Sequence, residues 1–122
     1  MSQNKQTVEK YLEGFRRSDH AMILSCLTDD CEWEMPGAFH WHGKKEFDGE
    51  IENDAFLGKP EIKCLRMVEE NDVVISEGTV NSRLKDGTPF FAVFCDVFEM
   101  RGDKIRKLTT YLMVVNQQEQ TK

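Results

Sequence analysis

The sequence lacks several features that mark large functional classes. No apolar run approaches the roughly 18 residues of a membrane span, and the first residues lack the apolar region of a secretory signal. A glycine-rich phosphate loop and a Gly-x-Ser-x-Gly nucleophile elbow are also missing. Positive charge is scarce, with 16 Lys and Arg against 22 Asp and Glu and a net charge of −6. Because this charge repels phosphate backbones and anionic lipids, we predict neither a nucleic-acid partner nor a membrane partner.

Cysteine pairs with redox or metal-binding spacing are absent too. The four cysteines, at positions 26, 31, 64 and 95, form no Cys-x-x-Cys motif, which indicates reduced, mostly buried thiols in a cytoplasmic protein. The first two could join His40 and His42 in a zinc site, but their Cys-x4-Cys spacing is loose and the histidines fall on an aromatic loop predicted over residues 39–43. We therefore predict no metal and no other cofactor.

Large soft side chains are what the chain has in excess. Its 122 residues suit a single domain, predicted over residues 1–122, with no internal repeat and a polar tail at residues 116–122. Within a hydrophobic content of 39% it has eight Phe, two Trp, two Tyr and six Met, more than a small core needs for close packing. We expect these side chains to have a use beyond the core.

Apolar residues at helical spacing predict two helices near the start of the chain. Residues 8, 11, 12 and 15 form one stripe of an amphipathic helix that begins near Asn4, which places Tyr11 and Phe15 on its apolar face. Asp19 can cap a second, shorter helix that ends before residues 28–30. A third helix is predicted in the charged segment after residue 43, where apolar residues 47, 51 and 55 recur at steps of four.

Strand patterns fill most of the remaining chain. Residues 31–35 alternate with a period of two, so Trp33 and Met35 should face the core while Glu32 and Glu34 face solvent. Residues 61–69, 73–84, 89–100 and 105–115 are rich in β-branched and aromatic residues and are separated by turn signals. Gly78 interrupts the second of these strands, where a bulge or bend would let the sheet curl. These patterns predict an α+β fold in which N-terminal helices and a curved antiparallel sheet enclose a pocket.

The strand over residues 90–98 is apolar on both faces, whereas an antiparallel sheet normally leaves one face to water. One face can meet the helices, and the other face needs a cover. We predict a homodimer that packs sheet to sheet through Phe91, Val93, Cys95 and Val97. A covering loop is the alternative.

Asp96 lies in the middle of this apolar strand. A carboxyl group beside Phe94, Val97 and Phe98 must be paired, hydrogen-bonded or protonated, and burial would raise its pKa. A neutral carboxylic acid in an apolar pocket can donate a hydrogen bond to a developing oxyanion. The other interpretation is a structural Asp that accepts hydrogen bonds at a bulge. Tyr11 would project into the same cavity, where a buried phenol needs a hydrogen-bond partner.

The order of the elements and several segments resemble the ketosteroid-isomerase-like, or SnoaL-like, family, which is related to nuclear transport factor two. The resemblance covers nearly the whole chain and implies a cone-shaped α+β domain of the kind also called a cystatin-like roll. It is carried by Tyr11-Leu12-Glu13 ahead of the Asp19 cap, by residues 27–37, by Trp41-His42-Gly43-Lys44, and by Cys95-Asp96-Val97 followed by Lys104-Ile105-Arg106.

The resemblance also implies roles for single residues. In the isomerases of this family an Asp base moves a proton while a Tyr and a protonated Asp hydrogen-bond the enolate oxygen, and these two donors fall on Tyr11 and Asp96. The base falls on Met35, and a thioether cannot take up a proton at neutral pH. Glu34 would need a bulge to turn inward, so His42 is the predicted replacement because imidazole titrates in the useful range. A loop histidine bonded to the backbone is the alternative interpretation of His42.

We therefore predict a pocket that binds a small cyclic or polyketide-like carbonyl compound. Tyr11 and Asp96 would polarise the carbonyl group, and His42 would be the base for proton transfer or cyclisation without a cofactor. The alternative is a non-enzymatic ligand-binding or dimerisation module, and an epoxide-opening hydrolase is a third option within the family. The predicted lining of the pocket consists of Tyr11, Phe15, Trp33, Met35, Trp41, Phe94, Asp96 and Phe98.

Overall fold

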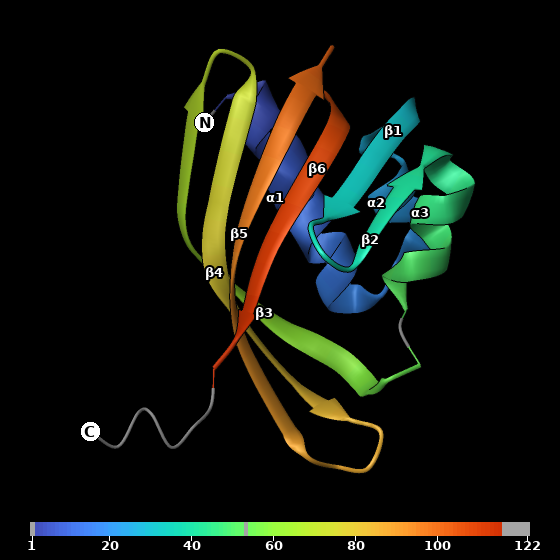
Figure 1. The fold of residues 1–122 in the computed structure, drawn as a ribbon. Coiled ribbons are helices and arrows are strands. Elements are labelled where there is room, and N and C mark those ends of the chain that lie inside the picture. Colours follow the sequence, from blue (N-terminus) through green and yellow to red (C-terminus); the bar gives the residue numbers. More distant parts are fainter. Residues whose placement is uncertain (1, 53, 116–122) are drawn as a thin grey trace.

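A computed structural model describes residues 2–52 and 54–115 and shows helices packed against one face of a curved sheet (Figure 1). The polar tail predicted at residues 116–122 lies outside the described residues. In chain order the elements are α1 (Gln3–Arg17), α2 (His20–Leu24), β1 (Leu27–Met35), β2 (Phe39–His42), α3 (Gly43–Ile51), β3 (Phe56–Glu70), β4 (Val73–Leu84), β5 (Pro89–Arg101) and β6 (Lys104–Val114).

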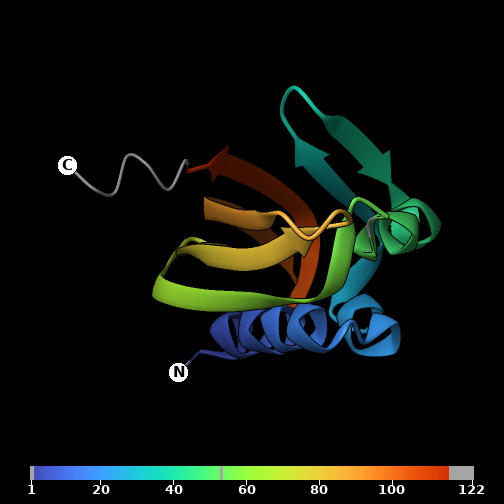
Figure 2. The same ribbon diagram turned by 90° about the horizontal axis from the view of Figure 1, so that it is seen from below.

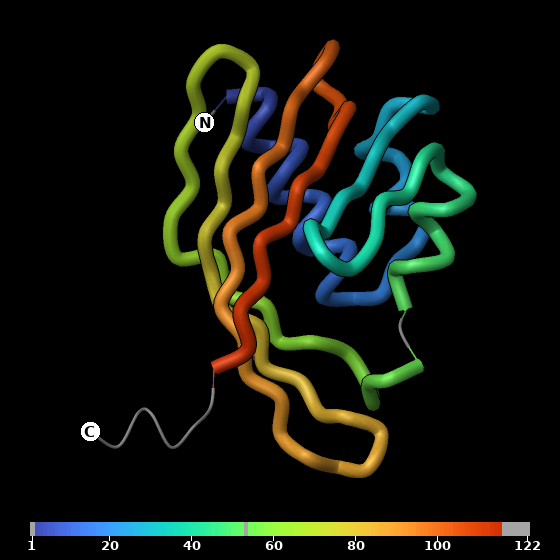
Figure 3. Tube along the Cα trace, viewed as in Figure 1, coloured from blue at the N-terminus to red at the C-terminus, as the bar shows by residue number. Residues whose placement is uncertain are grey.

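The six strands form one open sheet with the order β2-β1-β6-β5-β4-β3. The predicted meander from β3 to β6 is confirmed, with antiparallel pairing between successive strands. β1 pairs in parallel with β6, on the side of β6 that does not pair with β5. The sheet is therefore mixed rather than wholly antiparallel. In Figure 3 the four strands β3 to β6 run side by side and curve in the same direction, while the β1–β2 hairpin lies next to the helices. The predicted class, α+β with N-terminal helices against a curved sheet, is confirmed.

The helix α1 covers the inner side of this sheet. Ser2 caps its first turn, and Ser18 ends it in the left-handed conformation with φ of 53°. Figure 2 shows α1 lying beside β3 beneath the curve of the sheet. The predicted cap of α2 is also present, because the Asp19 carboxylate accepts a hydrogen bond from the backbone N–H of Met22 at 3.0 Å. None of the described helices is long and apolar enough to cross a membrane.

The segment predicted as an aromatic loop, residues 39–43, is instead the strand β2 followed by the start of α3. A tight turn after β1 explains the difference: the backbone N–H of Ala38 donates to the Met35 carbonyl at 2.8 Å, and Gly37 takes a positive φ of 85°. The chain therefore folds back on β1 and pairs with it antiparallel, from Met35 opposite Phe39 to Glu32 opposite His42. Helix α3 ends at Ile51, before the predicted third apolar position at residue 55.

Gly78 lies at a point where β4 is close to both β3 and a side chain of β5. The pairing of β3 with β4 shifts register between Cys64 and Arg66, directly opposite Gly78, so the predicted irregularity is a bulge on the partner strand. A Cβ at Gly78 would collide with the Lys63 carbonyl oxygen and lie 2.8 Å from the Phe94 ring. The absence of a side chain at this position therefore allows the sheet to bend around the cavity.

Candidate functional site

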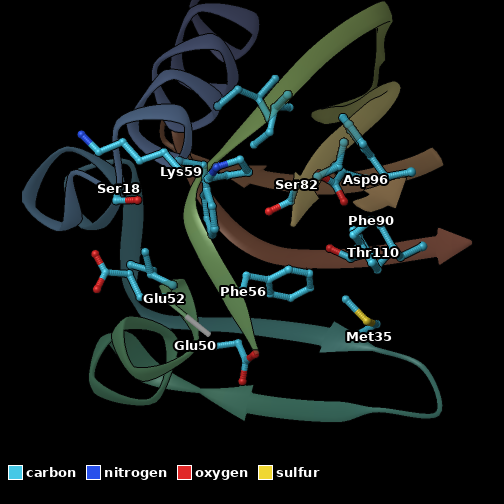
Figure 4. A pocket seen from close by; sticks show the side chains of 18 of the residues that line it. Ser18, Met35, Glu50, Glu52, Phe56, Lys59, Ser82, Phe90, Asp96 and Thr110 are labelled. Carbon is cyan, nitrogen blue, oxygen red and sulfur yellow. The ribbon is translucent and has the colours of Figure 1, made fainter. Parts of the chain in front are cut away.

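A cavity of about 560 Å³ lies between α1, the β1–β2 hairpin and the inner face of the curved sheet (Figure 4). Aromatic side chains from several elements line it, among them three that the sequence did not indicate, Phe39, Phe56 and Phe90. Phe90 could have been found from strand alternation, since it shares the face of β5 with residues 94 and 96. The predicted residues that do line the cavity are Tyr11, Phe15, Trp33, Met35, Phe94 and Asp96.

Asp96 provides a buried carboxyl group on the sheet side of this cavity, with an exposed fraction of only 8%. Among the described residues its Oδ1 atom has no hydrogen-bond partner. Burial raises the pKa of the Asp96 carboxyl to about 7, and a hydrogen bond from the Thr110 hydroxyl opposes this increase. At neutral pH the group is therefore present in both its protonated and its ionised form.

Thr110 connects Asp96 to the other wall of the cavity. It lies directly opposite Asp96 on β6, and its Oγ1 accepts a hydrogen bond of 3.0 Å from the indole N–H of Trp33 on β1. With this lone pair occupied, the Thr110 hydroxyl can direct its proton toward the carboxyl group of Asp96. The two hydrogen bonds, from Trp33 to Thr110 and from Thr110 to Asp96, thus fix one carboxyl oxygen of Asp96. The other oxygen, Oδ1, has no such partner among the described residues.

Tyr11 faces the same cavity from α1 and is only 2% exposed. Its ring packs against Phe15 and Phe98, with centroids 5.2 Å and 5.3 Å away. Burial raises the pKa of the Tyr11 phenol well above its ordinary value, and the nearby charge of Asp96 raises it further. The phenol therefore stays protonated at neutral pH and can donate a hydrogen bond into the cavity.

Comparison with known proteins places this arrangement in a family. A model of the SnoaL-like domain matches residues 8–108. The chain belongs to the SnoaL-like family. No curated protein matches the chain.

Solved structures share the fold of this SnoaL-like chain over nearly its whole length. An NTF2-like protein of unknown function from Burkholderia pseudomallei has a TM-score of 0.85 at 20% identity, covering 93% of this chain and 92% of its own. TerC, co-crystallised with polyporic acid, has a TM-score of 0.82 at 20% identity, and the match covers 98% of this chain and 97% of TerC. An LEH-like epoxide hydrolase from M. tuberculosis has a TM-score of 0.79 at 20% identity, and the match covers 91% of this chain and 83% of the hydrolase. At these identities the likeness shows the fold alone.

Two aromatic residues predicted to line the cavity of this SnoaL-like domain lie elsewhere. Phe98 is fully buried in the core behind Tyr11 and does not reach the cavity. Trp41 stacks on Phe39 with centroids 5.7 Å apart and donates its indole N–H to Glu50 at 3.0 Å. Phe39 therefore occupies the cavity wall that was predicted for Trp41.

His42 does not lie at the cavity, so its predicted role as base is corrected. Successive residues of a strand point to opposite faces, and Phe39 takes the cavity face of β2. His40 and His42 consequently point outward, where both approach Glu32. Glu34 also stays on the outer face, with its carboxylate 3.7 Å from the Lys107 ammonium group.

Met35 lies on the cavity wall at the position where the resemblance implies a base. The other charged groups on the wall come from α3, the segment after it and β3. In Figure 4 the labelled members of this group lie apart from Asp96, across the cavity. Within the described residues these groups are Glu50, Glu52, Asp54 and Lys59.

Proposed function

We propose that the cavity binds a small, mostly apolar carbonyl compound whose oxygen accepts hydrogen bonds from Asp96 and Tyr11. One observation carries this proposal: the Asp96 Oδ1 atom is buried and has no hydrogen-bond partner among the described residues, and the carboxyl group lies on the wall of an aromatic cavity. A buried polar atom without a partner is costly, and a ligand that supplies one removes that cost.

Two donors on one carbonyl oxygen would also make the neighbouring C–H bonds more acidic. The carbonyl oxygen gains negative charge when a proton leaves the adjacent carbon, and the protonated Asp96 and Tyr11 stabilise that charge. This chemistry would permit proton transfer or cyclisation without a cofactor. Because the pKa of Asp96 is about 7, part of the population holds the ionised carboxylate, which can accept the α-proton. Asp96 is then protonated and can donate, together with Tyr11, to the oxygen of the enolate that this transfer produces.

A non-enzymatic binding module is the second candidate. Met35 occupies the place of the family base, and His42 points away from the cavity. Both features favour a pocket that holds a ligand without converting it. The related fold of TerC, which was co-crystallised with polyporic acid, supports binding of a small organic molecule in either case.

Thermal unfolding with three probes tests the binding proposal: a steroid enone, an aromatic polyketide and a terpene epoxide. A ligand at 100 times its dissociation constant should stabilise the protein by roughly 2.7 kcal/mol. Asp96→Leu and Tyr11→Phe each remove one donor and should each reduce the shift given by the two carbonyl probes. Matched controls are Asp29→Leu, at a fully exposed carboxylate, and Tyr111→Phe, at the 54% exposed tyrosine, and both should leave the shift unchanged.

The outcomes distinguish the two candidates. Exchange of α-hydrogens of a bound carbonyl probe in D₂O, followed by NMR and lost in Asp96→Asn, would support proton transfer. Binding without exchange would support the non-enzymatic module. Equal thermal shifts in the wild type, Asp96→Leu and Tyr11→Phe would contradict the assigned donors, and no shift with either carbonyl probe would contradict the ligand class.

A further inference from the structure

We propose that the outer face of the β1–β2 hairpin is a binding site for one divalent transition-metal ion, with Glu32, His40 and His42 as ligands. The site is independent of the cavity function. It depends on β2 being a strand, because alternation along β2 places both imidazoles on one face of the hairpin. Their ring centroids lie 4.4 Å apart, and Glu32 stands directly opposite His42 on β1.

The three side chains converge on one point in space. The Glu32 Oε1 atom lies 2.9 Å from His40 Nε2 and 3.8 Å from His42 Nδ1. One ligand atom from each residue fits within 4.8 Å of the other two. Tetrahedral zinc, with bonds of about 2.0–2.2 Å, holds its ligand atoms about 3.3 Å apart. Small rotations of the two imidazoles are therefore enough to reach coordinating positions.

Neighbouring groups hold Glu32 in a suitable orientation. Arg106 donates to its other oxygen, Oε2, at 2.7 Å, and this leaves Oε1 facing the histidines. The charge of Arg106 is partly balanced by Asp30, whose carboxylate lies 3.4 Å away. Carboxylates that bind metal ions are commonly held in orientation by such a hydrogen-bonding partner, which does not itself contact the ion.

The donor set decides which cations would fit. Two imidazoles and one carboxylate suit zinc, nickel or copper, whereas magnesium and calcium prefer oxygen ligands alone. The side chain of His42 is 64% exposed and that of His40 is 41% exposed, so water can complete the coordination. Because the opposite face of the same hairpin carries the cavity residues Trp33 and Met35, a bound ion would also stiffen that wall of the cavity.

Equilibrium dialysis of the untagged full chain against Zn²⁺ tests this site. We expect one ion per chain and a loss of affinity of about tenfold or more in each of His40→Ala, His42→Ala and Glu32→Gln. The matched control is His20→Ala, since His20 pairs with Asp48 at 2.6 Å on another part of the molecule. Its affinity should equal that of the wild type.

Co²⁺ absorption separates this site from the thiols. Nitrogen and oxygen ligands give d–d bands alone, whereas binding at a cysteine adds a thiolate charge-transfer band. Thiolate bands, absence of saturable binding, or wild-type affinity in the double variant His40→Ala/His42→Ala would each overturn the proposal. Circular dichroism of every variant verifies the fold, and the exposed His42→Ala variant provides the test if Glu32→Gln fails to fold.

Discussion

At the scale of single residues, Asp96 combines a cost to stability with the proposed role in binding. An isolated carboxylate is expensive to bury, and the structure reduces this cost by shifting the group toward its neutral form. The Thr110 hydroxyl provides a hydrogen bond to one side of the group, while Oδ1 stays without a partner among the described residues. A carboxyl that served stability alone would be expected to satisfy both of its oxygens.

The raised pKa of Asp96 predicts a specific dependence of stability on pH. The folded state keeps the proton up to about pH 7, whereas the unfolded chain releases it near 3.8, so the free energy of unfolding should decrease as pH rises between these values. The decrease due to this group is roughly 4 kcal/mol. Asp96→Asn should lack it, because an amide does not titrate.

Urea unfolding of the wild type and Asp96→Asn from pH 4.5 to 8 measures this contribution as a difference. The difference removes the slopes of other groups that titrate in this range, among them His20, whose pKa is raised by its hydrogen bond with Asp48. Asp29→Asn is the matched control and should follow the wild type. A difference curve that does not change between pH 4.5 and 7 would show that Asp96 is ionised in the folded protein.

Single residues also show which parts of the site could be predicted from the sequence. Asp96 and Tyr11 were predictable because an acid in an apolar strand and a phenol on an apolar helical stripe are visible in local patterns. His42 was not, because its direction depends on whether residues 39–42 form a loop or a strand. The pairing with β1 decides that question, and this is a tertiary contact.

At the scale of elements, the close approach of β3 and of the Phe94 ring to β4 depends on the glycine at position 78. We expect Gly78→Ala to lower the free energy of unfolding by roughly 1–3 kcal/mol, since the new methyl group would overlap with the Lys63 carbonyl and the Phe94 ring. Backbone atoms cannot move aside as a flexible side chain can. Chemical denaturation monitored by circular dichroism measures the change.

Gly49→Ala is the matched control for that substitution. Gly49 lies within α3, and a Cβ there meets no atom within 4 Å. Alanine should therefore stabilise the helix by up to about 1 kcal/mol, because it restricts the unfolded chain and has the higher helix propensity. If both variants lost the same stability, close packing at Gly78 would not be the cause.

Strands with strong local signals were predicted more accurately than strands that depend on partners. The bounds of β4, Val73–Leu84, agree with the prediction because turn residues mark both ends. β3 begins at Phe56 rather than residue 61, since its first residues are held by pairing with the end of β4. The parallel contact of β1 with β6 joins segments far apart in the chain, and no local pattern indicates it.

At the scale of the whole molecule, the apolar side chains that are not in the core have two locations. One set lines the cavity, and another remains exposed on the outer face of the sheet. There Leu65 is 70% exposed, Met113 is 67% exposed and Val93 is 38% exposed. Apolar side chains gathered on one face of a sheet commonly mark an interaction surface.

We propose that a second copy of this chain covers this outer face, as the pattern of β5 indicates. Sedimentation velocity at micromolar concentration should therefore detect a dimer. Val93→Asp should shift the protein toward monomer, because association would bury an unpaired carboxylate. The matched control is Gln3→Asp, which adds the same charge on α1, away from the outer face, and should remain dimeric.

Salt distinguishes this contact from an electrostatic one. Each copy carries a net charge of −6, so two copies repel each other at long range and added salt screens that repulsion. An apolar interface should consequently persist or strengthen as salt rises, whereas an interface held by ion pairs should weaken. A wild-type protein that stays monomeric at all concentrations and salt levels would contradict the proposed dimer and leave the exposed apolar face to a different partner.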